Sequence, residues 1–327
     1  MNLLVDARWA GDTGIGRVFK EVMNRIPDEV SVRNVRSNVS LGHPFSPFIL
    51  SKEILKSQDV DQFYSPSYMP PLYSKVPFII TIHDLNHLYY YSFFHKIYLK
   101  YIIAFIARNA KTIITVSEFS KREIVNRLGI PEDKVKVVYN GVDDVFFSND
   151  EVLNLGFPYF LYVGNRRSYK NLEFTITAFA ASKISCDFKL VLSGKPDQHL
   201  LNLIKKLGIE NRIYFYGFIP EPELPKLYKG AYGLLFLSLM EGFGLPVLEA
   251  MASCTPVITS NSTSLKEIGS DSAILADPLN LKASIKEIEN LANGKYDYKE
   301  LVERGQLRAK EFSWERTASE TWEIILA

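Results

Sequence analysis

Short apolar runs that alternate with helical patterns constrain the fold of this chain more than any other feature. Such runs are typical of the buried strands of a parallel sheet. In the first half they cover residues 3–5, 78–82, 112–116 and 135–138, and in the second half residues 160–163, 189–192, 213–216, 233–237 and 256–259. Strands that alternate with helices predict an α/β doubly wound arrangement. Two such sets predict two Rossmann-like halves.

A polar segment separates the two sets of strands. The pattern breaks after residues 140–143 and runs into the polar residues 148–151. A chain of 327 residues also exceeds what one hydrophobic core usually supports. We therefore predict one domain over residues 1–150, a second over residues 151–310, and a terminal helix with Ser313 as its N-cap in residues 311–327.

Composition restricts the class of protein. Hydrophobic residues at 47% and charged residues at 23% are ordinary for a globular protein, and a net charge of +1 argues against a nucleic-acid binder. The two cysteines, Cys186 and Cys254, are widely separated, which fits a reducing compartment and offers no metal cluster. We see no signal peptide and no apolar run that approaches a membrane span of about 20 residues. The expected location is the cytoplasm, at most on the cytoplasmic face of a membrane.

Two glutamates eight positions apart, Glu241 and Glu249, flank a Gly-Phe-Gly-Leu-Pro turn. Pro246 suits the first turn of a helix, where its missing N–H costs nothing. Gly242 and Gly244 allow the backbone to approach a ligand, and the free N–H groups at a helix N-terminus attract anions. This layout suits an extended ligand with a charged middle and hydroxyls at both ends, as in a nucleotide sugar. The plainer interpretation is a pair of solvated carboxylates near a helix end.

The stretch from Glu241 to Glu249 resembles the E-x7-E motif of retaining glycosyltransferases of family 4, and residues 256–260 and 267–269 resemble that family's continuation. The resemblance implies the GT-B fold, in which two Rossmann-like domains face a central cleft. The first domain would bind the acceptor, the second the nucleotide sugar, and the terminal helix in residues 311–327 would cross back to the first domain. Glu241 would hold sugar hydroxyls and Glu249 the ribose hydroxyls. The turn between them would line the donor site with Gly242, Phe243, Gly244 and Leu245.

A glycine loop follows the first strand, with glycines at Gly11, Gly14 and Gly16. It is no dinucleotide fingerprint, because Phe19 stands where a third glycine is required. A tight turn and a ligand loop both remain open from the residues alone. The loop resembles the family's N-terminal glycine loop, which implies that Gly14 and Gly16 lie against the donor diphosphate.

His83 and Asp84 close a strand at its C-terminal end, where ligands bind in open α/β sheets. A lone histidine is more often structural, but this pair resembles the family's active-site histidine. The resemblance implies a catalytic His83 that contacts the transferred sugar, with Asp84 toward the acceptor. Ser117 follows the next strand and is expected to cap a helix, with a second role near the acceptor.

A basic loop opens the second half, with Gly164 followed by Arg166, Arg167 and Lys170. Arginine can donate hydrogen bonds to two phosphate oxygens at once, and lysine supplies a compact charge. Exposed basic loops without a ligand are also common. The loop resembles the family's phosphate loop, in which Lys170 would neutralise the leaving diphosphate. Asn165 replaces the usual arginine after the glycine. Arg166 is our preferred substitute, and Arg167 remains the alternative.

Four further positions come from the resemblance or from strand ends. Lys195 ends one strand and would line the nucleotide site. Phe218 and Ile219 end the next and resemble the family's segment beside the nucleobase, where Phe218 either stacks on the base or fills the core. Cys254 stands where relatives usually have glycine, which predicts a different geometry at that helix end.

The segment 88–107 is crowded with aromatic residues and carries interleaved basic ones, among them Lys96, Lys100 and Arg108. Such a helix can lie in a membrane interface. A core helix that covers the sheet is the alternative. The pattern raises peripheral membrane contact as a hypothesis.

Together with these features, the resemblance to family 4 implies a retaining, metal-independent hexosyltransferase with no cofactor besides its nucleotide-sugar co-substrate. Lys170, Arg166 and helix amides would stabilise the leaving diphosphate, and no Asp-x-Asp metal motif is present. The form of the basic loop resembles bacterial mannosyl- and rhamnosyltransferases, so a GDP-sugar and O-antigen, lipopolysaccharide or capsule synthesis are the first expectations. A sugar-nucleotide epimerase or hydrolase of the same fold, and a non-catalytic nucleotide-sugar-binding protein, remain as alternatives.

Overall fold

The computed structural model describes residues 1–11, 13–37, 39 and 43–327 of the chain, so Asp12 of the glycine loop lies outside it. The chain divides into two compact units. Unit 1 comprises Met1–Gly141 and Ser313–Ala327, and unit 2 comprises Val142–Phe312. Each unit is an α/β layer structure around its own sheet.

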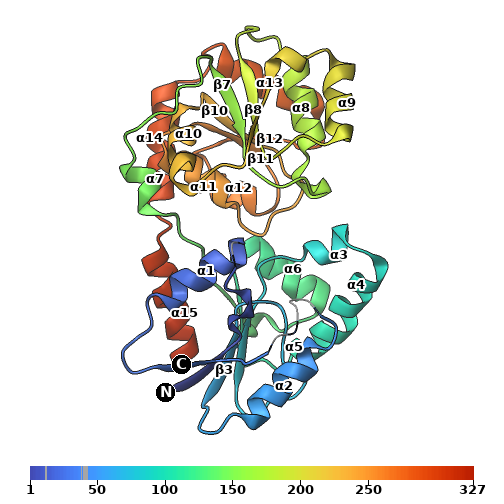
Figure 1. Ribbon diagram of the computed structural model, residues 1–327, viewed down its shortest axis with the longest axis vertical. Helices are drawn as coiled ribbons and strands as arrows, with labels where there is room; N and C mark the ends of the chain where they lie inside the picture. The colour runs from blue at the N-terminus through green and yellow to red at the C-terminus, as the bar shows by residue number, and fades with distance from the viewer. Residues whose placement is uncertain (12, 38, 40–42) are drawn as a thin grey trace. The chain divides into compact units, whose positions relative to one another are not determined.

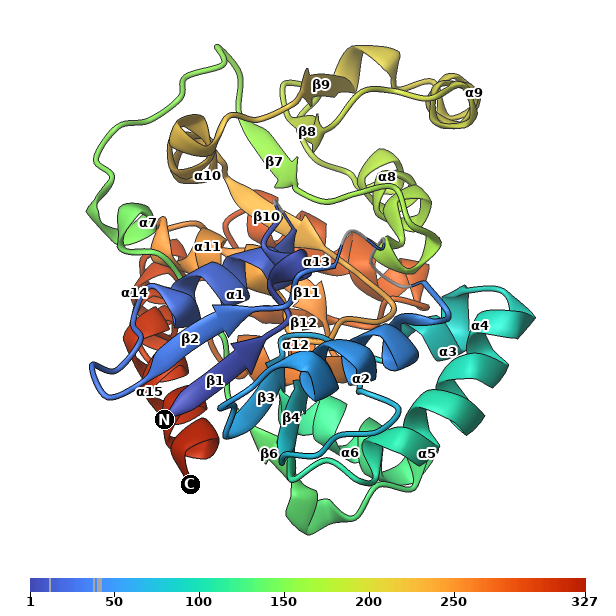
Figure 2. The same ribbon diagram turned by 60° about the horizontal axis from the view of Figure 1, so that its bottom comes forward.

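Unit 1 contains a six-stranded sheet in the order β2-β1-β3-β4-β5-β6, and every pairing is parallel. Figure 2 shows β2, β1, β3 and β4 next to one another in this order. The strands are β1 (Asn2–Val5), β2 (Ser31–Asn34), β3 (Gln62–Ser65), β4 (Phe78–Thr81), β5 (Thr112–Thr115) and β6 (Val135–Val137). All residues of β3 and β4 are buried, which matches the apolar character of strands covered on both faces.

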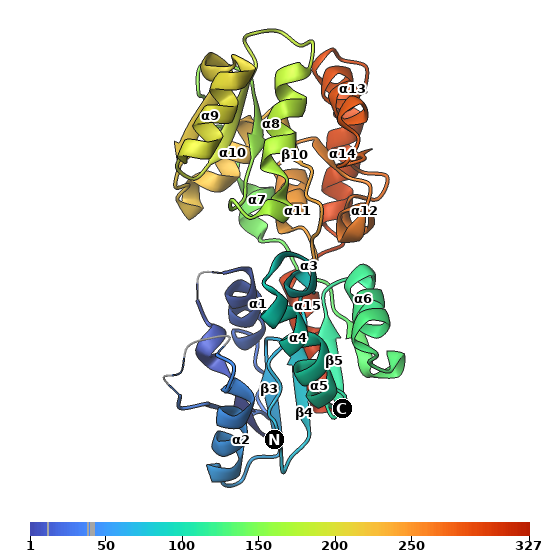
Figure 3. The same cartoon turned by 90° about the vertical axis from the view of Figure 1, so that its right-hand side faces the viewer.

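Helices cover both faces of this sheet (Figures 1 and 3). The helices are α1 (Gly14–Met23), α2 (Ser46–Lys56), α3 (Asn86–Tyr90), α4 (Phe93–Ile97), α5 (Ala104–Ala107), α6 (Glu118–Leu128) and α15 (Trp314–Leu326), with a π-helical segment at Tyr98–Ile103 and short 3₁₀ turns at Ala7–Trp9 and Glu132–Lys134. Residues of α2, α5 and α6 share one hydrophobic cluster against the sheet. Helices α1 and α15 pack against each other.

The terminal helix α15 is fastened to the rest of unit 1 by specific hydrogen bonds. Ser313 caps it by accepting from the amide of Arg316, as the sequence predicts. The indole of Trp322 donates to the carbonyl of Val22 at 3.0 Å, and the hydroxyl of Thr317 donates to the carbonyl of Tyr139 at 2.7 Å. Helix α15, at the end of the chain, therefore lies in the same layer of unit 1 as helix α1, at its beginning.

Unit 2 repeats the design with a second parallel six-stranded sheet, in the order β12-β11-β10-β7-β8-β9 (Figure 2). The strands are β7 (Tyr159–Tyr162), β8 (Lys189–Ser193), β9 (Ile213–Gly217), β10 (Gly233–Phe236), β11 (Val257–Ser260) and β12 (Ile274–Ala276). The predicted doubly wound arrangement is thus confirmed for both units.

The helices of unit 2 also form two layers. They are α7 (Asp144–Ser148), α8 (Leu172–Ala181), α9 (Gln198–Leu207), α10 (Leu224–Gly230), α11 (Leu245–Ala252), α12 (Thr263–Gly269), α13 (Leu281–Ala292) and α14 (Tyr298–Ala309), with 3₁₀ turns at Ser168–Lys170, Glu210–Arg212 and Glu221–Glu223. Helix α8 packs with α9 and α13, whereas α11 packs with α10, α12 and α14 (Figure 1).

Three strands of the structure were not predicted from the sequence. Strand β2 has mostly exposed residues because it forms the edge of its sheet, so it lacks an apolar run. Strand β12 is also an edge strand and has only three residues. Strand β3 is buried, but it begins with Gln62 and ends with Ser65. These polar ends leave no apolar run long enough to predict a strand.

The segment 88–107 is not one helix. It contains the end of α3, then α4, the π-helical segment and α5. Tyr91 and Ser92 interrupt the helix with extended backbone. Within the described residues, no helix combines the length and the apolar character that crossing a bilayer requires.

Cys254 occupies a left-handed backbone position with φ of 63°, directly after Ser253, the C-cap of α11. The amide of Thr255 bonds the carbonyl of Ala250 and the amide of Cys254 bonds that of Met251, a pair of bonds that ends a helix and favours glycine at its left-handed residue. The thiol offsets part of the cost of this left-handed conformation, because the side-chain amide of Gln306 lies 2.9 Å from its sulfur.

We expect Cys254→Gly to raise the free energy of unfolding by about 0.5–1 kcal/mol, because a left-handed residue with a Cβ costs about 1–2 kcal/mol and the lost sulfur contact offsets part of the gain. Urea unfolding followed by circular dichroism measures it. The matched control is Cys254→Ala, which keeps the Cβ and should bring no gain. Equal stabilities of the two variants would contradict this account of the helix end.

Candidate active site

The central strands of unit 2, β7 and β10, are neighbours whose following connections run in opposite directions, toward β8 and toward β11. Such a pair forms the switch point of an open α/β sheet, and ligands bind beyond the carboxyl ends of its strands. Lys170 lies in the loop after β7, and Glu241 lies in the loop after β10. The topology therefore brings together two residues that are far apart in the sequence.

Lys170 and Glu241 form an ion pair at this switch point. The ammonium nitrogen lies 2.8 Å from Oε1 of the carboxylate, and only 13% and 11% of the two side chains are exposed. The contact is an ion pair and not an aligned hydrogen bond, because Oε1 has no hydrogen-bond partner among the described residues. The ammonium also lies 5.0 Å from the ring centroid of Phe236. Each charge depends on the other, because a buried charge without a partner is costly.

Side-chain hydrogen bonds fix both loops that carry the pair. The amide of Asn171 donates to the carbonyls of Leu237 and Pro278, each at 3.0 Å. The hydroxyl of Ser264 lies 2.9 Å from the carbonyl oxygen of Glu241 and 2.8 Å from that of Phe243. The two loops are thus held in place before any ligand binds.

The turn after Glu241 leads directly into α11. Gly244 has φ of 124°, a conformation that favours glycine, and a Cβ there would also displace the terminal methyl of Leu265 at 2.7 Å. Leu245 is the first residue of the helix, and Pro246 lies in its first turn as the sequence predicts. Gly242 and Phe243 are buried in the turn. The amides at the start of α11 therefore lie immediately after Glu241 in the chain.

Glu249 lies about one turn into α11 and is buried, with 5% of its surface exposed. Its Oε2 accepts a hydrogen bond of 3.0 Å from the hydroxyl of Tyr228. Tyr228 was not predicted as a site residue, because a tyrosine in the short helix α10 carries no motif. The hydroxyl holds one carboxylate oxygen, and this fixes the orientation of the other.

The basic loop after β7 is tied to the end of β8. The hydroxyl of Ser193 accepts from the amide of Gly164 at 3.0 Å, and Nη2 of Arg166 donates to the carbonyl of Ser193 at 2.5 Å. Nη1 of Arg166 is buried and has no hydrogen-bond partner among the described residues. Burial lowers the pKa of Arg166 from its ordinary value. Arg166 thus turns inward against β8, whereas Arg167 is exposed.

The ends of β8 and β9 form a second part of this region. Gly194 and Gly217 have φ of 77° and 84°, and their backbones join through a 2.6 Å hydrogen bond. Lys195 follows and is exposed. Phe218 follows Gly217 with 84% of its surface exposed, and Ile219 is half-buried. Phe218 therefore does not fill the core, and its ring is open to a stacking partner.

In unit 1, His83 follows β4 and contacts the loop after β3. Its Nε2 lies 3.0 Å from the carbonyl oxygen of Pro66. Because a carbonyl can only accept, Nε2 carries the proton and Nδ1 keeps a lone pair. Burial lowers the pKa of the imidazole below its ordinary value of 6.5, so the ring is neutral at pH 7. His83 can therefore accept a hydrogen bond from a hydroxyl.

The two predicted acceptor residues have local structural roles. Both oxygens of Asp84 accept hydrogen bonds of 2.9 Å from Asn86, one from its backbone and one from its side chain. Ser117 is buried, and its hydroxyl accepts from the amide of Ser120 at 3.0 Å as the predicted cap of α6. These contacts shape the chain after β4 and β5.

The glycine loop of unit 1 forms the start of α1. Gly14 is the first residue of the helix, and Thr13 caps it by accepting from the amide of Gly16 at 3.1 Å. A Cβ on Gly16 would lie 1.8 Å from the carbonyl oxygen of Gly11, so no side chain fits there. Gly14 has open space around it instead. Close packing therefore explains why glycine stands at position 16. At position 14, the approach of a ligand would explain it.

No group of three or more histidine, cysteine, aspartate or glutamate side chains among the described residues could hold a metal ion. Lys170 and Arg166 both carry positive charge in the loop after β7.

We expect Lys170→Met to lower the free energy of unfolding by about 3 kcal/mol, because it leaves the carboxylate of Glu241 buried without a partner. The double variant Lys170→Met/Glu241→Gln should cost less than Lys170→Met alone. Urea unfolding of the two variants measures the difference. As a control, Lys299→Met removes an exposed ion pair with Glu303 and should cost less than about 1 kcal/mol. A double variant that is less stable than Lys170→Met would rule out a compensating buried pair.

Two known protein families match this chain, and their boundary lies close to that between unit 1 and unit 2. Residues 145–308 match the family described as "Glycosyl transferases group 1", and residues 11–146 match "Glycosyltransferase Family 4". An O-antigen chain mannosyltransferase B of Escherichia coli is 31% identical over 229 residues, which cover 65% of this chain and 60% of that protein. The O-antigen chain mannosyltransferase RfbU of Salmonella typhimurium is 29% identical over 80% of this chain and 76% of that protein. The chain thus spans less than two thirds of the first of these relatives.

Solved structures share the whole architecture. Anabaena HepE in complex with UDP and glucose has a TM-score of 0.79 at 17% identity, and the match covers 99% of both chains. WaaG, a glycosyltransferase involved in lipopolysaccharide biosynthesis, has a TM-score of 0.75 at 13% identity over 99% of both chains. These likenesses establish the expected GT-B fold. The chain belongs to glycosyltransferase family 4, the group 1 glycosyl transferases.

Proposed function

We propose that this protein is a retaining hexosyltransferase that moves a mannose- or rhamnose-type sugar from a nucleotide sugar, a GDP-sugar as first candidate, to a saccharide or lipid-linked saccharide. The observation that carries the proposal is the buried pair of Lys170 and Glu241 at the switch point of unit 2. A strongly held lysine in this position suits an anionic ligand. The names of the curated relatives support the choice of sugar and of O-antigen or related surface polysaccharide as its destination.

The donor would lie along the carboxyl ends of the strands of unit 2. Lys170, Arg166 and the amides at the start of α11 would hold the diphosphate. Glu241 would orient the sugar hydroxyls, and the carboxylate of Glu249, which Tyr228 orients, would accept from the ribose hydroxyls. Phe218 would stack on the base, because its exposed ring offers a flat apolar face.

Transfer would break the bond between the anomeric carbon and the phosphate oxygen, and the electron pair would go to the diphosphate. The acceptor oxygen would form the new bond from the same face of the sugar, and its proton would leave on the diphosphate. Lys170 and Arg166 would stabilise the charge that develops there, which is electrostatic catalysis without a metal. The neutral His83 would accept a hydrogen bond from the transferred sugar. We place this activity in the cytoplasm, on the cytoplasmic face of the membrane when the acceptor is lipid-linked.

Thermal unfolding against GDP-, UDP-, ADP- and dTDP-sugars, measured once with Mg²⁺ and once with EDTA, tests the proposal. We expect one nucleotide to raise the melting temperature selectively, because a ligand at 100 times its Kd stabilises the folded state by about 2.7 kcal/mol. Glu249→Gln keeps an acceptor for Tyr228 and should weaken binding about tenfold. Phe218→Ala should weaken it by a similar factor, because base stacking contributes about 1–3 kcal/mol.

The control is Glu303→Gln, which changes an exposed carboxylate on α14 and should leave the shift intact. Absence of a shift with every nucleotide sugar, or equal affinities for Glu249→Gln and the wild type, would refute the donor site. A shift that EDTA abolishes would refute metal independence alone.

A further inference from the structure

The segment after β4 has apolar residues on two sides. Leu99, Ile103 and Ala107 belong to the hydrophobic core of unit 1. A second row at four-residue intervals points outward, with exposed fractions of 69% for Phe93, 38% for Ile97, 63% for Tyr101 and 69% for Phe105. We call these four residues the exposed row. Large exposed apolar surfaces usually mark an interaction site.

The π-helical segment keeps this row on one side. On an α-helix of about 3.6 residues per turn, a four-residue repeat drifts steadily around the axis. The π-helical segment Tyr98–Ile103 winds more residues into each turn and lies between α4 and α5, so it compensates for the drift. Irregular turns of this kind are frequent at functional sites. The backbone irregularity and the exposed row therefore point to the same surface.

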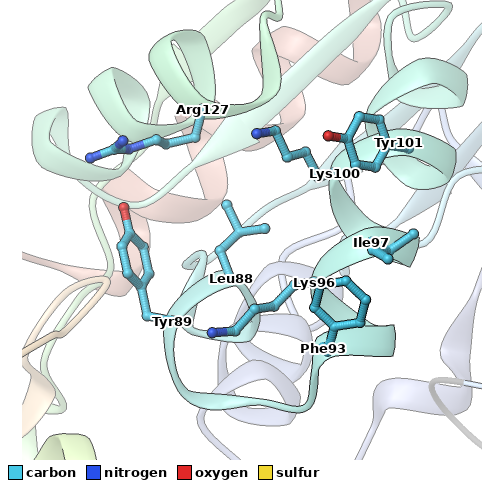
Figure 4. A pocket seen from close by; sticks show the side chains of 8 residues that line it. All are labelled: Leu88, Tyr89, Phe93, Lys96, Ile97, Lys100, Tyr101 and Arg127. Atoms are coloured by element: carbon cyan, nitrogen blue, oxygen red, sulfur yellow. The ribbon is translucent and has the colours of Figure 1, made fainter.

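A pocket of about 420 Å³ opens beside the row. Its lining combines Phe93, Ile97 and Tyr101 of the row with Leu88, Tyr89 and the basic residues Lys96, Lys100 and Arg127. Figure 4 shows Leu88 in the middle of these side chains, with Lys96, Lys100 and Arg127 on the helices around it. An apolar row thus borders a pocket that carries three cationic side chains.

The charges around the pocket are one-sided. Residues 85–117 contain no aspartate or glutamate. Within the part of the chain that the structure describes, no carboxylate lies within ion-pair distance of Lys96 or Lys100. Glu123 approaches the pocket, but it already accepts from the hydroxyl of Tyr89 and pairs with Arg127 at 3.6 Å. Two lysines therefore remain available for an anion.

We propose that this surface of unit 1 docks on an anionic membrane. Lys96 and Lys100 hold the phosphate of an anionic phospholipid in the pocket, while the apolar side chains of the exposed row enter the interface. Aromatic side chains favour the headgroup level of a bilayer, and lysines near an anionic leaflet add attraction. The inference goes beyond the proposed sugar transfer, since it assigns a lipid site that the reaction does not use.

Co-sedimentation of the full chain with vesicles tests the proposal, and no nucleotide sugar is present, so failure of the donor site cannot affect the result. We expect binding to vesicles of phosphatidylcholine with 30% phosphatidylglycerol (about one charge in three lipids) and little binding to phosphatidylcholine alone. Lys96→Ala/Lys100→Ala should weaken binding about 25-fold, roughly fivefold for each lysine. Phe93→Ser/Phe105→Ser should also weaken binding to the vesicles. The difference in binding between this variant and the wild type should persist in high salt.

Matched controls come from unit 2. Lys282→Ala/Lys286→Ala removes two exposed lysines with the same four-residue spacing, and Leu279→Ser/Leu307→Ser removes two exposed apolar side chains. Both should bind as the wild type does. Unchanged melting temperatures show that the variants are folded.

Three results would overturn the proposal. The wild type does not bind anionic vesicles, the control lysine pair loses as much binding as Lys96→Ala/Lys100→Ala, or free glycerol phosphate at the headgroup concentration releases the protein. The last result would indicate a site for a soluble phosphate and not for a membrane.

Discussion

The buried ion pair between Lys170 and Glu241 is the interaction on which the site of unit 2 depends. The sheet order makes it possible, because β7 and β10 are neighbours whose connections diverge and leave their two loops facing each other. Asn171 and Ser264 then fix these loops. Without a ligand the pair neutralises itself. A diphosphate would offer Lys170 a stronger partner and free Glu241 for sugar hydroxyls.

Unit 1 uses the same topological device with different chemistry. Its switch point lies between β1 and β3, and it is bordered by the loop before α1 and the loop after β3. His83 is fixed to the second loop through Pro66, which sets its protonation and leaves Nδ1 as an acceptor. The exposed row lies on the helices after β4 and so belongs to the same unit. In our account, recognition of acceptor and membrane is thus concentrated in this unit.

The sequence predicted the repeated α/β pattern and the family motif because both rest on local signals. Apolar runs marked the covered strands, but the edge strands β2 and β12 lack such runs. The caps at Ser117 and Ser313 are local and were predicted correctly. The contacts of Lys170 with Glu241 and of Glu249 with Tyr228 are not local, since they depend on strand order. The π-helical segment was not predicted, because its neighbours are helical and the whole stretch was interpreted as one helix.

The most direct test of the central claim compares a nucleoside diphosphate with its monophosphate by titration calorimetry, using GDP and GMP first. If Lys170 binds the second phosphate, the wild type binds the diphosphate more tightly, and Lys170→Met/Glu241→Gln removes most of this preference while it keeps the affinity for the monophosphate. The double variant is chosen because it leaves no buried carboxylate unpaired. A preference for the diphosphate that is the same in both proteins would contradict the account.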